Sequence, residues 1–117
     1  MSYIDSVERT IVIYETTDGK SPFLDWLNGL RDVKARATIR ARLDRVRLGN
    51  LGDSKSIGDG VHELRITFGP GYRVYFGQDG LLLVVLLCGG DKGSQKRDIA
   101  KAKTLWREYY ANKKLSE

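Results

Sequence analysis

Two arginines and a lysine, Arg65, Arg73 and Lys92, have the residue types and spacing expected of a phosphate-binding site. The planar guanidinium of arginine binds a phosphate through two parallel hydrogen bonds, and lysine can carry a proton during catalysis. Gathering like charges costs stability unless an anion binds between them. The alternative is an ordinary solvated sheet face, on which Arg65 pairs with Glu63 or Asp91.

The elements around these residues predict that the three cations converge. Residues 61–68, 72–78 and 81–88 have the patterns of three consecutive antiparallel strands. In the first two strands the even positions are mostly apolar, which leaves Arg65, Arg73 and Tyr75 on the other face. A three-residue loop, 69–71, would pair Ile66 with Val74. Arg65 would then face Tyr75 and lie diagonal to Arg73.

The next turn brings in the lysine. The pair Asp79-Gly80 is typical of a two-residue type I′ hairpin, which would pair Gln78 with Leu81, Arg73 with Leu86, and Gly71 with Cys88. The glycine loop 89–92 (GGDK) would therefore leave the sheet at the same end as loop 69–71. The register thus predicts one cationic site made by Arg65, Arg73 and Lys92.

The remaining elements complete an α+β fold in a single domain, residues 1–117. A strand is expected over 9–17, a helix from Ser21-Pro22 to about Leu30, and a glycine- and aspartate-rich loop over 50–60. Two longer helices are expected over 33–48 and 94–110. Their apolar stripes are Ala35, Ile39, Leu43 and Val46 in the first, and Ile99, Ala102, Trp106 and Tyr109 in the second. The helices are expected to cover one face of the three-stranded meander.

Composition favours a cytoplasmic protein with a polyanionic partner. The chain has 117 residues and a formal net charge of +5, and its acidic excess is confined to residues 1–30. No apolar run is long enough to span a membrane, and no secretory signal is visible. The single cysteine, Cys88, excludes an internal disulfide, and no Cys/His set suits a zinc ion. The arginines of 33–48, including Arg40 and Arg47, form either an RNA- or ribosome-contacting surface or a solvated face.

Other chemistries are weaker. The GGDKGSQ loop does not fit the P-loop pattern, and an antiparallel sheet disfavours a nucleotide-binding fold. His62 lies at an apolar position and is expected to be structural, and Cys88 is expected to be a small buried side chain. No metal or small-molecule cofactor is expected.

The same residues carry a resemblance to a known family. GVHELRITFGPGYRVYF and CGGDKGSQKRDIAKAKTLW resemble the phage-derived, HigB-type addiction module killer branch of the RelE/ParE toxin superfamily. The resemblance extends upstream through YETTDGKSPFLDWLNGLRD and RLGNLGD, and so covers nearly the whole chain. It implies a RelE-like α+β fold and the toxin half of a type II toxin–antitoxin pair. Such toxins act as ribosome-dependent mRNA endonucleases.

The resemblance also implies site residues and partners. The arginines of its ELR and GYRVYF motifs are Arg65 and Arg73, and the basic residue of its GGDK loop is Lys92, which gives the predicted catalytic set. Some members use several histidines and others a late tyrosine near the position of Asp98, and this chain has neither the extra histidines nor that tyrosine. The expected partners are a helix-turn-helix antitoxin and mRNA on the ribosome. The residues expected to contact RNA are Tyr75, Gln95, Lys96, His62, Arg40 and Arg47.

Two other functions remain open from the sequence. One is a ParE-like protein that poisons DNA gyrase without cutting RNA. The other is a catalytically silent module that binds only its antitoxin. Net charge does not separate them, because one scaffold serves unrelated functions.

Overall fold

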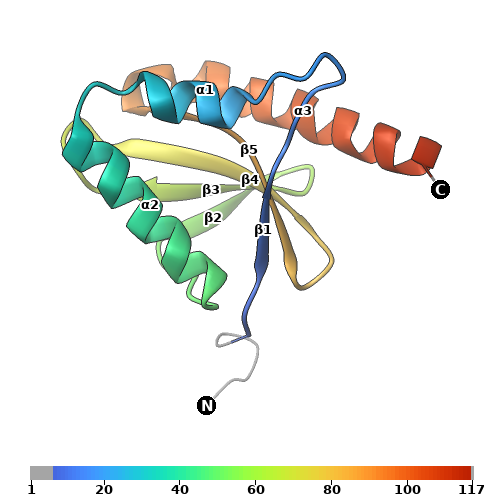
Figure 1. Cartoon of the computed structure of the whole chain (residues 1–117), viewed down its shortest axis with the longest axis horizontal. Helices are drawn as coiled ribbons and strands as arrows, with labels where there is room; N and C mark the ends of the chain where they lie inside the picture. The colour runs from blue at the N-terminus through green and yellow to red at the C-terminus, as the bar shows by residue number, and fades with distance from the viewer. Residues whose placement is uncertain (1–6, 117) are drawn as a thin grey trace.

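One five-stranded mixed sheet organises the chain, with strand order β1-β5-β4-β3-β2 (Figure 1). The computed structural model describes residues 7–116. The strands are β1 (Thr10–Ile13), β2 (Ser54–Gly58), β3 (Val61–Ile66), β4 (Tyr72–Asp79) and β5 (Leu83–Asp91). The helices are α1 (Pro22–Gly29), α2 (Val33–Arg47) and α3 (Gln95–Ser116), with a 3₁₀ turn, Lys92–Ser94, before α3. Only β1 runs parallel to its neighbour, β5.

The α+β class and the helices match the prediction, whereas two of the predicted strand assignments were wrong. The loop expected over 50–60 contains β2, which pairs with β3 from Ser54↔Leu64 to Gly58↔Val61. Pairing to an existing strand holds this polar segment in place despite its low strand propensity. The strand expected over 9–17 is shortened to β1, because the chain leaves the sheet after Tyr14, whose N–H donates to the Leu86 carbonyl.

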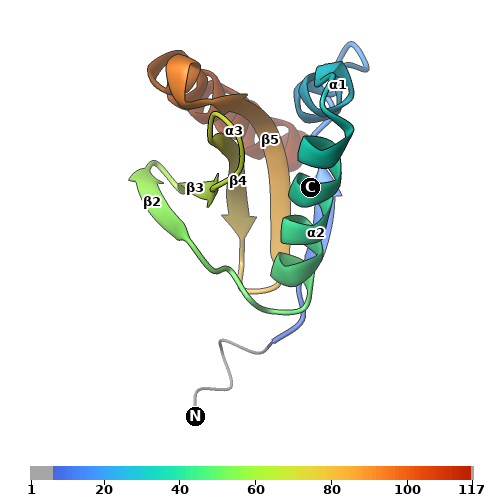
Figure 2. The same ribbon diagram turned by 90° about the vertical axis from the view of Figure 1, so that its left-hand side faces the viewer.

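Helices cover both faces of the sheet, so the expectation of a single covered face was wrong (Figure 2). The stripe Ala35, Ile39, Leu43 and Val46 of α2 is buried with α1 against one face, as its spacing predicts. On the other face α3 packs on Tyr75, Val85 and Leu87. Those side chains occupy the odd positions of β4 and β5, and they are too apolar to be left in water. Helix α3 therefore lies on the same face as Arg65 and Arg73.

The strand register keeps the predicted parity and shifts by two residues. Leu64 rather than Ile66 pairs with Val74, and Arg65 lies directly opposite Arg73. The connection between β3 and β4 is accordingly five residues long, 67–71, and not three. The parity survives because a one-residue slip would expose the apolar set of both strands.

The hairpin between β4 and β5 also differs from the prediction. Asp79 pairs with Leu83, so the loop has three residues, 80–82, in place of a two-residue turn. A register irregularity between Tyr75 and Phe76 then brings Gly90 opposite Arg73. The Asp79 carboxylate accepts hydrogen bonds from α3, from the Tyr109 hydroxyl and the Lys113 ammonium, each at 2.7 Å. These contacts hold the end of β4 at Asp79, one residue beyond the end that the turn signal predicted.

No helix within residues 7–116 is long and apolar enough to cross a bilayer. Helix α3 is the longest at 22 residues, but charged side chains occur along its whole length.

Candidate functional site

The structure brings Arg65, Arg73 and Lys92 together around one depression of about 430 Å³, here called the arginine pocket. The two arginines are cross-strand neighbours on β3 and β4. Lys92 reaches them because β5 ends beside loop 67–71, where the Lys92 N–H donates to the Gly71 carbonyl at 3.2 Å. Asp53 and the backbone of loop 67–71 complete the lining. The convergence predicted from strand parity is therefore present, although the residues pair differently.

Arg65 is held by Asp53 and not by Glu63 or Asp91. Its Nε and Nη2 both donate to Oδ1 of Asp53, at 3.1 and 2.9 Å. The two side chains are 41% and 55% exposed, so this ion pair is weak and can exchange for another anion. Asp53 presents its oxygen to the guanidinium as a phosphate oxygen would. No sequence motif marks Asp53, because it precedes β2 in the segment expected to be a loop.

Arg73 is anchored from below by a buried carboxylate. Its Nε lies 3.4 Å from Oε2 of Glu63, whose side chain is completely buried, while the Arg73 side chain remains 12% exposed. The same Oε2 accepts hydrogen bonds from the Tyr75 hydroxyl at 3.3 Å and from Nε2 of Gln95 at 2.9 Å. A buried carboxylate is costly unless it is paired and hydrogen-bonded, so this cluster fixes Arg73 at the floor of the pocket. The sequence signal that could have revealed Glu63 is its parity, because it shares one face of β3 with Arg65 and lies opposite Tyr75.

Tyr75 therefore supports the pocket from inside, whereas the sequence placed it in contact with RNA. Gln95 also binds Glu63 but is only half-buried, so its predicted contact with RNA stays a prediction. Tyr75 is fully buried beneath α3. Burial, with a smaller contribution from Glu63, raises the pKa of its hydroxyl far above the ordinary value. A neutral, buried phenol has no surface to offer an RNA strand. The sequence analysis placed it outside because it left this face of the sheet uncovered.

His62 lies on the opposite face of β3 from Arg65. Its ring stacks on Phe76 with centroids 5.2 Å apart, and burial lowers the pKa of its imidazole. This position supports the structural role expected from its apolar parity and separates it from the arginine pocket. Lys96 is exposed on the first turn of α3 and does not line the pocket.

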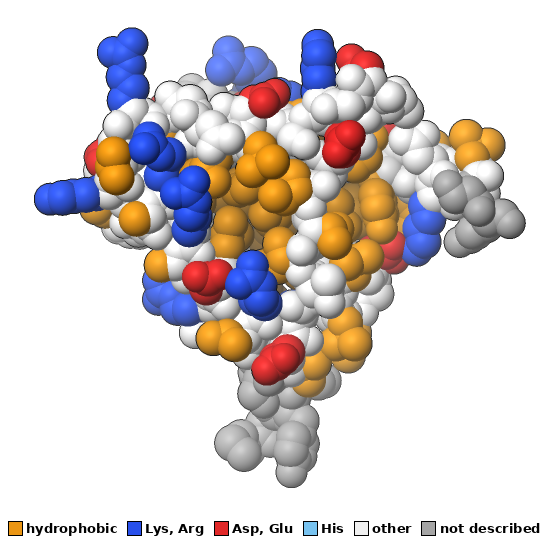
Figure 3. Space-filling view, in the orientation of Figure 1, with side chains coloured by type: hydrophobic (Ala, Val, Ile, Leu, Met, Phe, Trp, Pro, Cys, Tyr) orange, Lys and Arg blue, Asp and Glu red, His pale blue; other side chains and the backbone are white. Residues whose placement is uncertain are grey.

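The cationic surface continues onto α2 through Arg42 and Arg45, which belong to the arginines of 33–48 considered from the sequence. Arg42 and Arg45 share with Arg65 a second depression of about 320 Å³. Arg42 is buried and donates to the Leu51 carbonyl. Burial and the nearby Arg45 lower the pKa of its guanidinium. Arg40 and Arg47 are exposed outside both depressions, and Arg47 pairs with Asp44 at 2.7 Å. Lysine and arginine side chains gather over α2 on the left of Figure 3.

Comparison with known proteins places the chain in a family. No family model matches the sequence. The chain is 51% identical over 86 residues to an uncharacterized protein of Haemophilus influenzae, and the match covers 74% of this chain and 87% of the relative. The chain belongs to the family of that protein. The relative's name states no activity, so function is inferred from the geometry of the site.

No metal-binding set is formed within residues 7–116. No group of three or more His, Cys, Asp or Glu residues there is arranged to hold a metal ion. The site is therefore described through its arginines, its lysine and the buried carboxylate beneath them.

Proposed function

We propose that this chain is the toxin of a type II toxin–antitoxin pair, with a RelE-like fold, and that it cuts mRNA on the ribosome. The observation that carries the proposal is the gathering of Arg65, Arg73 and Lys92 around one depression. Its volume of about 430 Å³ falls in the range of roughly 300–1,000 Å³ typical of ligand pockets. The ELR, GYRVYF and GGDK motifs, which resemble those of the RelE/ParE toxins, supply these three residues.

The proposed reaction is attack of a ribose 2′-OH on the adjacent phosphate. The 2′-oxygen bonds to phosphorus and the 5′-oxygen leaves, which gives a 2′,3′-cyclic phosphate and a 5′-hydroxyl end. Arg65 and Arg73 stabilise the additional negative charge of the phosphorane, because preorganised donors act most strongly where charge develops. A general base takes the proton of the 2′-OH, and a general acid protonates the leaving 5′-oxygen. Lys92 is the candidate for one of these two transfers, since it is exposed at the mouth of the pocket.

Glu63 acts through Arg73 and is a positioning residue. With Nε of Arg73 facing Glu63, the terminal nitrogens of the guanidinium remain available to a phosphate. Tyr75 and Gln95 hold the carboxylate in turn. A Glu63→Gln variant keeps the shape of this side chain and removes its charge. It should therefore lower the cleavage rate through Arg73 while substrate binding through Arg65 persists.

The expected partners are mRNA on the ribosome and a helix-turn-helix antitoxin encoded nearby. The cations on α2, Arg42 and Arg45, extend the arginine pocket toward a polyanion. No cofactor is required for the proposed reaction, and the expected compartment is the cytoplasm.

The test is induction of the chain alone in cells, with mRNA 5′ ends mapped and DNA breaks scored in the same culture. Codon-phased mRNA cuts that disappear in Arg73→Ala support the nuclease. Arg107→Ala is the matched control, because Arg107 is an exposed arginine on α3 outside the pocket. DNA breaks with intact mRNA would instead identify a gyrase poison, and the absence of mRNA cuts, DNA breaks and growth inhibition would identify a binding module.

A further inference from the structure

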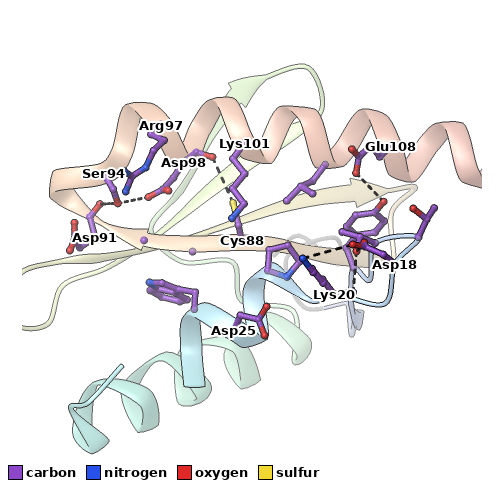
Figure 4. Close-up of a pocket in the computed structure, with 18 of the residues that line it drawn as sticks. Asp18, Lys20, Asp25, Cys88, Asp91, Ser94, Arg97, Asp98, Lys101 and Glu108 are labelled. Atoms are coloured by element: carbon purple, nitrogen blue, oxygen red, sulfur yellow. Dashed lines mark hydrogen bonds and ion pairs between the residues drawn. The ribbon is translucent and has the colours of Figure 1, made fainter. Parts of the chain in front are cut away.

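A second hollow, larger than the arginine pocket, lies along the free edge of β5. It has a volume of about 1230 Å³ and is here called the β5 groove. Figure 4 shows α3 on one side of β5, with Asp98 and Lys101 on it, and Asp25 on the other side. The proposed nuclease chemistry uses none of its lining.

The floor of the groove is an unpaired strand edge. β1 pairs with β5 only from Thr10↔Leu83 to Ile13↔Leu86. Residues 87–91 of β5 have no strand partner on the β1 side, and residues 88–91 pair with β4. This leaves about 16 Å of extended backbone, at 3.3 Å per residue, with one set of N–H and C=O groups facing the groove.

Gly89 and Gly90 leave room for α1 and α3 to pack close to the free edge of β5. A Cβ atom on Gly89 would lie 2.2 Å from the Trp26 ring of α1, and one on Gly90 would lie 1.8 Å from Oδ2 of Asp98 on α3. Side chains there would push the two helices apart. The glycines therefore keep a narrow slot in which another backbone can approach β5 closely.

The charged side chains that line the β5 groove indicate what kind of segment it can bind. The carboxylates lining the groove are Asp18, Asp25, Asp91, Asp98 and Glu108, and the cations are Lys20, Arg97 and Lys101. Lys20 lies 3.9 Å from Asp18, which offsets one of these cations. The groove is thus acidic on a chain whose net charge is +5. Such a surface repels a nucleic acid and attracts a basic segment.

We infer that the β5 groove binds an extended, basic segment of a partner protein, which adds a strand to β5 at residues 87–91. The added strand binds through main-chain hydrogen bonds. Its alternate side chains contact α1 on one side of the groove and α3 on the other. One set of the added side chains faces α1, where Asp25 and Trp26 together suit a lysine or arginine. The other set faces α3 near Asp98. The volume exceeds the roughly 1,000 Å³ typical of the largest small-molecule pockets, which also favours a peptide.

The test uses the full chain and a short peptide of alternating lysine and threonine. Binding should slow amide exchange at residues 87–91, with protection absent from the arginine pocket. The same peptide with every second backbone amide N-methylated should not bind, because its strand-pairing donors are removed. Asp25→Lys should weaken binding about tenfold, whereas Asp44→Lys, an exposed acid on α2 outside the groove, should not.

Several results would overturn the inference. They are absence of binding, equal binding of the N-methylated peptide, equal binding of a glutamate–threonine peptide, and protection elsewhere than residues 87–91. Self-association of the chain that protects residues 87–91 without any peptide would also overturn it, since the occupant would then be a second copy. None of these outcomes depends on RNA cleavage.

Discussion

The carboxylate of Asp53 binds the guanidinium of Arg65 at nitrogens that could also bind a phosphate. The two hydrogen bonds between them are at 3.1 and 2.9 Å, and both side chains face solvent. If the proposed function is right, a phosphate that binds Nε and Nη2 of Arg65 displaces Asp53 from them. The contact acts as a weak competitor at the entrance of the arginine pocket.

Asp53→Asn should therefore strengthen binding of single-stranded RNA. An exposed ion pair is worth at most about 1 kcal/mol, so the gain should be no more than about fivefold. Fluorescence anisotropy with a labelled oligonucleotide measures it, with Asp44→Asn as the control for a lost surface charge. Unchanged affinity in Asp53→Asn would show that Asp53 does not compete with the phosphate.

His62 provides a prediction about pH, since it is the only histidine of the chain. Burial lowers the pKa of its imidazole below the ordinary 6.5. Between the folded pKa and 6.5 the unfolded chain binds more protons than the folded chain, so the free energy of unfolding rises with pH through this window. Urea denaturation at about pH 5 and about pH 7 should show this rise, and His62→Phe should reduce it. Equal pH dependence in the two proteins would contradict the assignment.

At the scale of elements, a close contact between Gly77 and Trp106 helps to seat α3 on the sheet. A Cβ atom on Gly77 of β4 would lie 2.2 Å from the Trp106 ring. Gly77→Ala should therefore destabilise the protein by about 1–3 kcal/mol, the usual cost of overpacking. Gly29→Ala is the control, because no atom lies within 4 Å of a Cβ at Gly29, and it should be neutral or slightly stabilising. Thermal denaturation compares the two, and equal melting temperatures would refute the contact.

The helices, whose apolar residues recur with a strong period, were predictable from the sequence. The strand that forms only by pairing with a neighbouring strand was not. The apolar stripes of α2 and α3 pack against the sheet as their spacing indicates, because an apolar helix face is stable only when it is buried in a core. β2 was missed because Lys55 and Ser56 become strand residues only when β3 lies beside them. The two-residue shift between β3 and β4 preserves parity, so no pattern of apolar residues could detect it.

For the site, residue types were predictable and their supports were not. Arg65, Arg73 and Lys92 converge because parity and the end of the sheet fix their side and their neighbourhood. Glu63 and Tyr75 belong to the buried support because α3 covers their face, and the sequence pattern does not show which face a terminal helix covers.

At the scale of the whole molecule, two surfaces of opposite charge meet at the 3₁₀ turn Lys92–Ser94. Lys92 lines the arginine pocket, while Asp91 and Gly93, next to it in sequence, line the β5 groove. The proposed RNA phosphate and the inferred basic peptide would contact different residues. The two proposals can therefore be tested independently.

The most direct test of the central claim uses ribosomes programmed with an mRNA that carries a single 2′-deoxy nucleotide at the cut position. The full chain should cut the all-ribose mRNA to a 2′,3′-cyclic phosphate and leave the deoxy mRNA intact, because the attacking oxygen is missing. Arg73→Ala should lower the rate on the ribose substrate by about 10²–10³-fold. Cleavage of the deoxy mRNA at the full rate, or an undiminished rate in Arg73→Ala, would contradict the account.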